Sequence, residues 1–289
     1  MTKPIILVTG KNGQLGSELQ VLSQVINEFE FVFTDTLELD ITNQDKVEEY
    51  FKHYRPYACI NTAAYTAVDK AETERELAFA INADGVKNLA DSCIAFGTRL
   101  VHVSTDYVYS GTATEPYKEY EKVDPVNYYG FTKLKGEEAA ATNPLTVIIR
   151  TSWVYSYVGN NFVKTMMRLM KDRESISVVN DQLGTPTYAA DLAEAIVMIL
   201  KAESFHPGVY HFSNEGNISW FDFAVAIRDI AELNCNVNPI DTAGYPTPAK
   251  RPAYSVMSKE KIKTTYNIEL KDWKASLRRC IKLLQQIQP

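Results

Sequence analysis

A tyrosine and a lysine four residues apart form the pair of side chains best suited to proton transfer in this 289-residue sequence. They are Tyr129 and Lys133, in the segment VDPVNYYGFTKLKGEE at 123–138. On a helix, this spacing places both side chains on one face, one turn apart. An isolated phenol, with a pKa near ~10, is a poor proton shuttle at neutral pH, but a nearby ammonium stabilises the phenolate and lowers that pKa. The pair therefore predicts a general acid, Tyr129, modulated by Lys133, which could also hydrogen-bond to the ribose of a nicotinamide cofactor.

The same spacing arises by chance in charged helices, so a second feature has to support a catalytic pair. The segment VSTDYVYSG at 103–111 ends an apolar run typical of a parallel strand, and ligands bind beyond the carboxyl ends of such strands. Successive strand residues point to opposite faces, so Ser104 and Thr105 should not both face a site. One of these hydroxyls could hydrogen-bond to a substrate carbonyl oxygen while the tyrosine protonates it and a hydride reaches the carbon.

Three glycines near the N-terminus indicate a dinucleotide site. Gly10, Gly13 and Gly16 lie in TGKNGQLGSEL, after an apolar strand at 4–9 and before a helix. Glycines allow a tight turn and let the backbone approach a pyrophosphate, while the helix N-terminus offers free amide hydrogens. Without these flanking elements the triplet would be only a strand-to-helix turn. With them it matches the dinucleotide-binding fingerprint.

Aspartates after the second predicted strand bear on the choice of cofactor. Asp35 ends that strand about 20 residues after the glycines, where a carboxylate binds an adenosine ribose and favours NAD over NADP. The alternative is an ordinary strand-end aspartate. Asp40 is a second polar candidate, although it could simply help to open the next helix.

The order of elements predicts an α/β fold, a Rossmann-like doubly wound parallel sheet. Short apolar, β-branched runs alternate with segments of helical spacing, which is typical of a parallel sheet covered on both faces. We expect residues 1–150 to form the dinucleotide-binding domain. Residues 151–289 are expected to form mainly a smaller substrate-binding lobe, packed on the first and partly interleaved with it. The predicted strands are 4–9, 31–35, 58–63, 99–104, 146–150 and 208–213.

Composition and charge exclude several classes of function. Apolar residues make up 45% and charged residues 23% of the chain, as in ordinary soluble globular proteins, and the net charge of −6 argues against nucleic acid as the main partner. The cysteines and histidines show no metal-ligand or disulfide spacing. No signal peptide and no apolar run of ~20 residues is visible, so we expect a cytoplasmic protein without a membrane partner, either a monomer or a homodimer.

The glycine turn, the hydroxyl after a later strand and Tyr-x-x-x-Lys on a helix together resemble the extended short-chain dehydrogenase/reductase superfamily. Within it, the chain is similar to the family of dTDP-4-dehydrorhamnose reductases. The resemblance covers nearly the whole sequence. The matching stretches are GKNGQLG (10–16), AAYTAVDKAE (63–72), STDYVY (104–109), YGFTKLKGE (129–137), RTSWVY (150–155), GNNFVKTMMRL (159–169), DQLGTPT (181–187) and YPTPAKRP (245–252).

The resemblance implies reduction of the C4 ketone of a nucleotide sugar, dTDP-4-dehydro-L-rhamnose, by NADPH or NADH. It makes Tyr129 the proton donor and Lys133 its modulator, and it selects Thr105 as the hydroxyl beside the carbonyl. Thr105, Asp106 and Trp153 match substrate-contacting positions. The implied cofactor contacts are Gly13, Gln14 and Leu15 at the pyrophosphate, Asp35, Asp40 and Ile41 near the adenosine half, and Ala64, Tyr65 and Thr66 along the middle.

One departure concerns a metal. Some members of the family form dimers that bind magnesium through interface glutamates, and Glu18 matches the first such position. The second position appears in this sequence as Ala190, beside Asp191. Magnesium is therefore not supported by the sequence.

Two other functions remain open at this point. A nucleotide-sugar dehydratase would need an Asp-Glu pair after the threonine, whereas Asp106 is followed by Tyr107, and an epimerase would retain oxidised cofactor. A non-catalytic regulatory subunit, like the beta subunit of methionine adenosyltransferase, resembles the same family, but it lacks the segment AAYTAVDKAE at 63–72.

Overall fold

A six-stranded parallel sheet forms the centre of the larger lobe in the computed structural model, which describes residues 3–287. The strands lie in the order β2-β1-β3-β4-β5-β10, so the predicted doubly wound parallel sheet is confirmed. Their bounds are β1 Ile5–Thr9, β2 Glu30–Thr34, β3 Ala58–Asn61, β4 Arg99–Thr105, β5 Thr146–Thr151 and β10 Gly208–His211.

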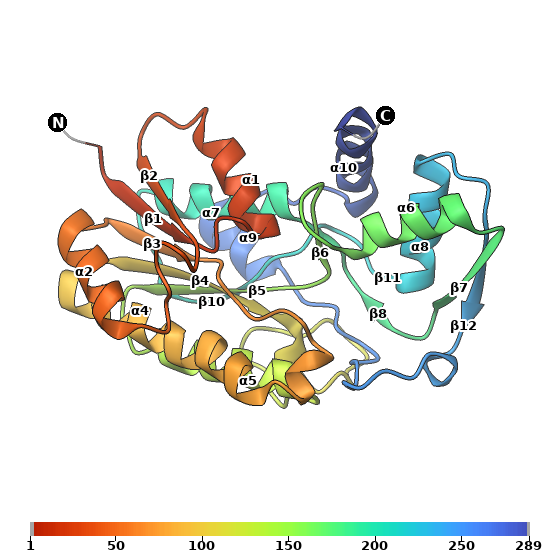
Figure 1. Ribbon diagram of the computed structural model, residues 1–289, viewed down its shortest axis with the longest axis horizontal. Coiled ribbons are helices and arrows are strands. Elements are labelled where there is room, and N and C mark those ends of the chain that lie inside the picture. Colours follow the sequence, from red (N-terminus) through yellow and green to blue (C-terminus); the bar gives the residue numbers. More distant parts are fainter. Residues whose placement is uncertain (1–2, 288–289) are drawn as a thin grey trace.

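Helices cover both faces of this sheet (Figure 1). Side chains alternate along β1, so Ile6 and Val8 pack with α1 (Gln14–Ser23) and α7 (Ala189–Lys201). Leu7 faces the other way, into the core formed with α2 (Gln44–Tyr54), α4 (Gly85–Phe96) and α5 (Tyr128–Ala140). Burial on both faces explains why these strands are continuous apolar runs.

The strand order reverses beside β1, because β2 pairs with one side of β1 and β3 with the other. In open parallel sheets, ligands bind at the carboxyl ends of the strands where the order reverses. The ends of β1 and β3 are tied together there. The Thr9 hydroxyl donates to Asn61 Oδ1 at 2.7 Å, and the Thr62 hydroxyl donates to the Thr9 carbonyl at 2.6 Å.

A second, smaller core lies beside the carboxyl ends of the strands (Figure 1). It contains α6 (Phe162–Asp172), α8 (Trp220–Ile230) and α10 (Trp273–Ile287), with the parallel pair β7 (Ser175–Val179) and β12 (Asn236–Ile240). The expected boundary near residue 150 stays a prediction, since α7 and β10 lie with the first lobe.

The remaining elements are short. They are α3 (Arg75–Phe79), α9 (Glu260–Tyr266), the 3-10 turns η1 (Lys70–Glu72), η3 (Asp106–Val108) and η4 (Thr242–Gly244), the π-helical turn η2 (Ala80–Asp84), and the strands β6 (Val154–Tyr155), β8 (Leu183–Gly184), β9 (Thr187–Tyr188) and β11 (Ile218–Ser219). In the part of the chain that the structure describes, no helix has the length and apolar character to cross a membrane.

Candidate active site

The glycine turn leaves room for a ligand at the end of β1. Gly10 has a left-handed φ of 72°, and a Cβ there would lie 2.7 Å from the backbone nitrogen of Ala63. Gly13 is the N-cap of α1 and supplies no capping side chain, and Gln14, Leu15 and Gly16 form the first turn of the helix. The free amide hydrogens of this turn fit a pyrophosphate.

The predicted adenosine corner adjoins this turn. Asp35 follows β2, and its carboxylate accepts hydrogen bonds from the amides of Asn12 at 3.0 Å and Thr36 at 2.8 Å. Asp40 instead accepts from the amide and hydroxyl of Thr42, ahead of α2. Ile41 is buried in the core on that face of the sheet. The structure therefore ties Asp35 to the glycine turn and gives Asp40 and Ile41 local structural contacts.

Ala64, Tyr65 and Thr66 follow β3 and so lie on the chain next to the glycine turn. The amide of Tyr65 donates to Asn82 Oδ1 at 2.8 Å, and its hydroxyl donates to Glu74 at 2.6 Å. These contacts hold the segment at the edge where β1 and β3 end.

The predicted tyrosine–lysine pair lies in the first two turns of α5. The helix begins after Asn127, whose side chain accepts a hydrogen bond from the amide of Gly130 at 2.8 Å. Tyr129 is 9% exposed and Lys133 2% exposed, and Lys133 Nζ donates to the carbonyl oxygen of Val103 on β4 at 2.7 Å. The structure thus brings both residues against the carboxyl end of β4.

The expected lowering of the pKa of Tyr129 is wrong for this structure. Burial raises the pKa of Tyr129 above that of a free phenol, and the nearby Asp106 raises it further, while contact with Thr105 opposes the rise. Burial also lowers the pKa of Lys133 to about 8. Desolvation therefore disfavours the phenolate, and Tyr129 stays protonated at neutral pH.

The structure separates the two hydroxyls that end β4. The Ser104 hydroxyl donates to the buried carboxylate of Glu137 at 2.5 Å. The Thr105 hydroxyl donates to Asp106 Oδ1 at 2.9 Å and lies with Tyr129. Thr105 is therefore the hydroxyl on the side of the tyrosine, as the alternation of strand residues requires of one of the two.

Asp106 is a buried carboxylate that is incompletely paired. Its Oδ2 has no hydrogen-bonding partner among residues 3–287, and burial raises its pKa to about 6. A buried polar atom without a partner is costly, and such atoms concentrate at functional sites. The position of Asp106 beside Thr105 and Tyr129 suits a contact with a polar substrate.

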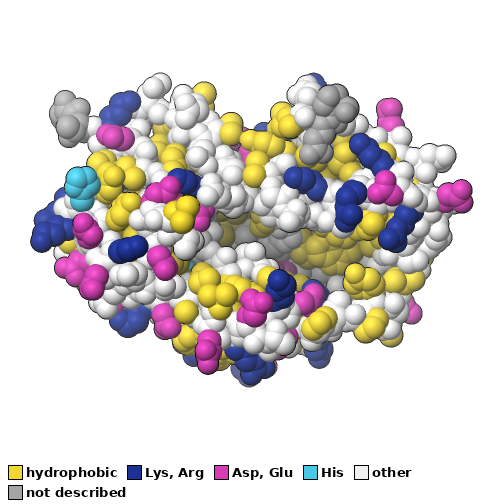
Figure 2. Space-filling model, in the orientation of Figure 1, with side chains coloured by type: hydrophobic (Ala, Val, Ile, Leu, Met, Phe, Trp, Pro, Cys, Tyr) yellow, Lys and Arg dark blue, Asp and Glu magenta, His cyan; other side chains and the backbone are white. Residues whose placement is uncertain are grey.

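A cavity of about 670 Å³ opens between the two lobes. Figure 2 shows hydrophobic side chains bordering this hollow. Tyr107, whose ring meets that of Tyr129 edge to face, connects it to the tyrosine–lysine pair. Residues from both lobes line it, and many are apolar. They are Asp69, Tyr107, Phe162, Thr165, Met166, Leu169, Arg173, Ile176, Ser177, Val178, Val179, Gln182, Trp220, Tyr245, Thr247 and Arg251.

Trp153 adjoins this lining and contacts it through the indole of Trp220. Its ring stacks on Trp220 with centroids 3.6 Å apart. Sequence reasoning did not identify Trp220 or Glu137. The sequence spacing could have indicated Glu137, because this residue stands four positions after Lys133. Nothing in the local sequence marks Trp220 as a neighbour of Trp153.

Arg251 lines the cavity and spans the two lobes. It forms an ion pair with Asp69, with Nη2 and Oδ2 2.8 Å apart. Asn161 caps α6 by accepting from the amide of Lys164, and it also donates to Gln14 Oε1 at 2.9 Å. Both residues therefore connect the second lobe to segments near the expected ligands.

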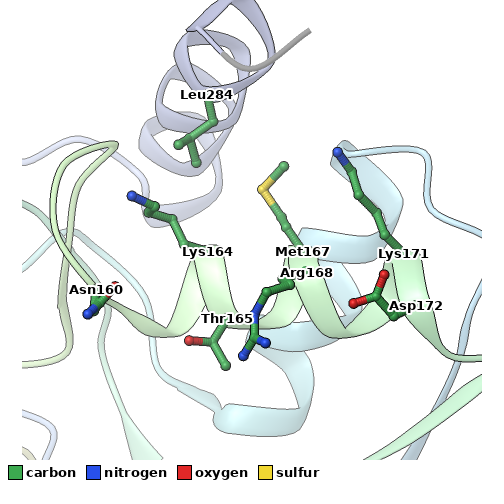
Figure 3. A pocket seen from close by; sticks show the side chains of 8 residues that line it. All are labelled: Asn160, Lys164, Thr165, Met167, Arg168, Lys171, Asp172 and Leu284. Atoms are coloured by element: carbon green, nitrogen blue, oxygen red, sulfur yellow. The ribbon is translucent and has the colours of Figure 1, made fainter.

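A second hollow of about 680 Å³ lies elsewhere, between α6 and α10. Figure 3 shows Lys164, Arg168 and Lys171 on α6 and Leu284 on α10. Its lining comes from these two helices and Asn160, so this hollow is separate from the tyrosine–lysine pair on α5.

Glu18, Ala190 and the neighbouring Asp191 do not fit a magnesium site. Among residues 3–287, no three or more His, Cys, Asp or Glu side chains are grouped so as to hold a metal ion. Glu18 accepts a hydrogen bond from Ser156 at 2.7 Å. Asp191 accepts from Lys271 at 2.9 Å and from Arg279 at 2.6 Å, so cations of the chain itself occupy this carboxylate.

Comparison with known proteins agrees with the geometry. Residues 3–286 match the family model described as RmlD substrate binding domain. A dTDP-4-dehydrorhamnose reductase of Aggregatibacter actinomycetemcomitans is 42% identical over 94% of this chain and 97% of its own length.

Two solved structures are similar throughout. A dTDP-4-dehydrorhamnose reductase of Clostridium acetobutylicum has a TM-score of 0.94 and 43% identity, covering 97% of this chain and 99% of its own. Another, of Bacillus anthracis in complex with NADP, has a TM-score of 0.93 and 41% identity, covering 98% and 100%. This chain therefore belongs to the RmlD substrate binding domain family, the family of the dTDP-4-dehydrorhamnose reductases.

Proposed function

We propose that this chain reduces the C4 ketone of dTDP-4-dehydro-L-rhamnose to give dTDP-L-rhamnose, with NADPH or NADH as hydride donor and Tyr129 as proton donor. The observation that carries the proposal is the buried pair Tyr129–Lys133, set beside Thr105 at the carboxyl end of β4. It occurs in a chain that matches reductases of this kind over nearly its whole length.

The roles follow from the chemistry of a ketone. When bound, the nicotinamide supplies a hydride to C4, and the carbonyl oxygen then needs a proton. Tyr129, which burial keeps protonated, gives its proton to that oxygen, and Lys133 stabilises the phenolate left behind. Thr105 donates a hydrogen bond to the same oxygen and so orients the carbonyl.

The cofactor is held by the end of the sheet. Gly10, Gly13, Gln14, Leu15 and Gly16 hold the pyrophosphate, whose charge suits the N-terminus of α1. Asp35, with Asp40 and Ile41, borders the adenosine half. Ala64, Tyr65 and Thr66 follow the middle of the cofactor, and Tyr129 and Lys133 reach the nicotinamide ribose.

The sugar nucleotide extends into the second lobe. Asp106 accepts hydrogen bonds from sugar hydroxyls, since its Oδ2 has no hydrogen-bonding partner in the part of the chain that the structure describes. Trp153 offers an aromatic wall to the sugar. The nucleotide half occupies the apolar cavity between the lobes, where Arg251 lies at the wall with a charge suited to a diphosphate.

A turnover assay tests this function. The purified chain is mixed with dTDP-4-dehydro-L-rhamnose and NADPH or NADH, and the absorbance of the reduced nicotinamide and the sugar product are followed together. The expected result is one reduced cofactor consumed for each sugar reduced at C4. Tightly held oxidised cofactor with no net consumption would indicate an epimerase instead, and binding without turnover would indicate a regulatory protein.

A further inference from the structure

A third ionisable side chain continues the stripe of catalytic groups along α5. Tyr129, Lys133 and Glu137 follow one another at intervals of four residues, so they share one face of the helix. All three are buried, and Glu137 is 4% exposed. A carboxylate is seldom buried without partners, so its contacts indicate what it does.

The Glu137 carboxylate joins three elements of the sheet lobe. Oε1 accepts from the Ser104 hydroxyl on β4 at 2.5 Å and from Arg150 Nε on β5 at 2.9 Å. Oε2 accepts from Arg150 Nη2 at 2.7 Å, which completes a two-pronged ion pair. One carboxylate from α5 thereby fixes the ends of β4 and β5.

The ion pair is supported from behind by a chain of hydrogen bonds. Arg150 Nη1 donates to the Tyr109 hydroxyl at 2.7 Å, and that hydroxyl lies 2.7 Å from His211 Nε2 on β10. His211 Nδ1 lies 2.9 Å from the Ser258 carbonyl oxygen, so it carries the proton and Nε2 accepts from Tyr109. Burial lowers the pKa of His211 to about 3, so the imidazole is neutral and the charge that pairs with the Glu137 carboxylate here is the Arg150 guanidinium.

Ser104 lies between the two β4 groups that the reaction uses. The Val103 carbonyl before it accepts from Lys133 Nζ at 2.7 Å, and the Thr105 hydroxyl after it lies with Tyr129. Because Glu137 holds the Ser104 side chain, it fixes the orientation of the backbone on both sides. Loss of this contact would therefore loosen both Lys133 and Thr105.

Glu137 also acts on the charge of Lys133. The ionisable groups that act on Lys133 are Glu137 from its own helix and His102 from β4, and burial keeps His102 neutral. Tyr129 lies one turn before Lys133 on the same face of α5. Burial lowers the pKa of Lys133 to about 8, and the Glu137 carboxylate opposes that fall. Without this carboxylate the ammonium would lose its proton at a lower pH.

We propose that Glu137 is a positioning residue for the reduction: from one turn beyond Lys133, it keeps that ammonium charged and holds Ser104 so that Val103 and Thr105 present their oxygens to Lys133 and to the substrate carbonyl. This inference rests on the proposed function, and it assigns a catalytic consequence to an ion pair that would otherwise serve only the fold.

The test compares E137Q with E137Q/R150M by pH profile and thermal unfolding. E137Q leaves the Arg150 charge buried without a partner, so a loss of thermal stability is expected. The double variant removes both charges and should recover most of that stability. In both variants the alkaline limb of the pH profile of kcat/KM should shift to lower pH by about one unit. At pH values above the limb, kcat/KM should therefore fall by about tenfold.

Glu138→Gln is the matched control, since the neighbouring Glu138 is exposed and pairs with Lys135 at the surface. It should leave the profile unchanged. S104A removes only the hydrogen bond between Ser104 and Glu137. In this variant kcat should fall, while the alkaline limb of the pH profile should stay at the same pH.

The outcomes separate the possibilities. If the double variant regains both stability and the wild-type pH profile, Glu137 serves only the fold and the proposal is overturned. It is also overturned if E138Q moves the limb as far as E137Q does. If the unmodified chain fails to reduce the ketosugar at all, the proposed function fails first, whatever Glu137 does.

Discussion

The indole of Trp153 lies flat on the indole of Trp220, with ring centroids 3.6 Å apart and ring planes 11° apart. Trp153 adopts a left-handed backbone conformation, with φ of 48°, which is strained for a bulky residue. On another side its ring meets Gly184, where a Cβ would lie 2.6 Å away. Trp220, a cavity-lining residue of α8, therefore holds Trp153 in place.

Replacing Trp220 by leucine should weaken substrate use and leave the cofactor site intact. The stack contributes about 0.5–1.5 kcal/mol beyond the area it buries, so KM for the ketosugar should rise by about three- to tenfold. NADPH affinity, measured by fluorescence in the absence of sugar, should stay within about twofold. W220F should restore most of the affinity, because a phenyl ring still stacks. An equal loss of NADPH affinity would show instead that the lobe has come apart.

Asp106 should make the stability of the chain depend on pH. Its pKa is raised to about 6 in the folded chain from the usual 3.8. A raised carboxyl pKa contributes stability that is full below about pH 4 and is lost as pH rises through about 6. The shift corresponds to about 2–3 kcal/mol. Urea unfolding should therefore show that D106N removes this loss between about pH 4 and pH 7, relative to the wild-type chain.

The exposed Asp172→Asn variant serves as control for Asp106 and should keep the wild-type slope. D106N should also lose turnover, because the amide cannot replace the carboxylate toward sugar hydroxyls. A D106N profile with the same slope as wild type would show that the raised pKa has no role in stability.

Lys11 should decide the preference between NADPH and NADH. It pairs with Glu38, whose other oxygen accepts from the Asp35 amide at 2.9 Å, at the corner where a ribose 2′-phosphate would lie. A charge-assisted hydrogen bond is worth about 1.5–3 kcal/mol, so K11M should weaken 2′,5′-ADP binding about tenfold or more and leave 5′-AMP binding nearly unchanged. E38Q should tighten 2′,5′-ADP. Titration calorimetry measures both.

Lys87→Met is the matched control for Lys11, because Lys87 forms a comparable surface pair with Asp91 on α4. It should affect neither ligand. Equal weakening of 2′,5′-ADP and 5′-AMP by K11M would place Lys11 at the 5′-phosphate side instead.

Chelation of divalent metals should leave turnover and melting temperature unchanged. The Asp191 carboxylate is occupied by Lys271 and Arg279 of the chain itself. R279M should lower the melting temperature, since it removes one cation from a carboxylate that is 5% exposed. A loss of activity in EDTA that magnesium restores would contradict this assignment.

Much of the fold was predictable, because β1, β3, β4 and β5 are buried on both faces and are therefore apolar runs. The pair β7 and β12 was not predicted. Ser175 and Ser177 interrupt the first strand, and Pro239 lies within the second, where a proline argues against a strand. These strands pair across about 60 residues of sequence, so only tertiary contacts reveal them.

The site, like the fold, contains residues that the sequence predicted and residues that it did not. Tyr129 and Lys133 were predicted from their spacing, because a helix converts a separation of four residues into a shared face. The choice between Ser104 and Thr105 stayed open on strand alternation alone, and the structure ties Ser104 to Glu137. Trp220 could not be predicted, since its contact with Trp153 joins different elements. The raised pKa of Tyr129 required knowledge of burial that spacing does not provide.

The most direct test is the reduction rate of the Y129F variant. Phenylalanine keeps the ring and removes only the proton donor, so NADPH-dependent reduction of the ketosugar should fall by about 100-fold or more, while NADPH affinity stays within about twofold. A Y129F variant that reduces the ketosugar at the wild-type rate would contradict the role of Tyr129.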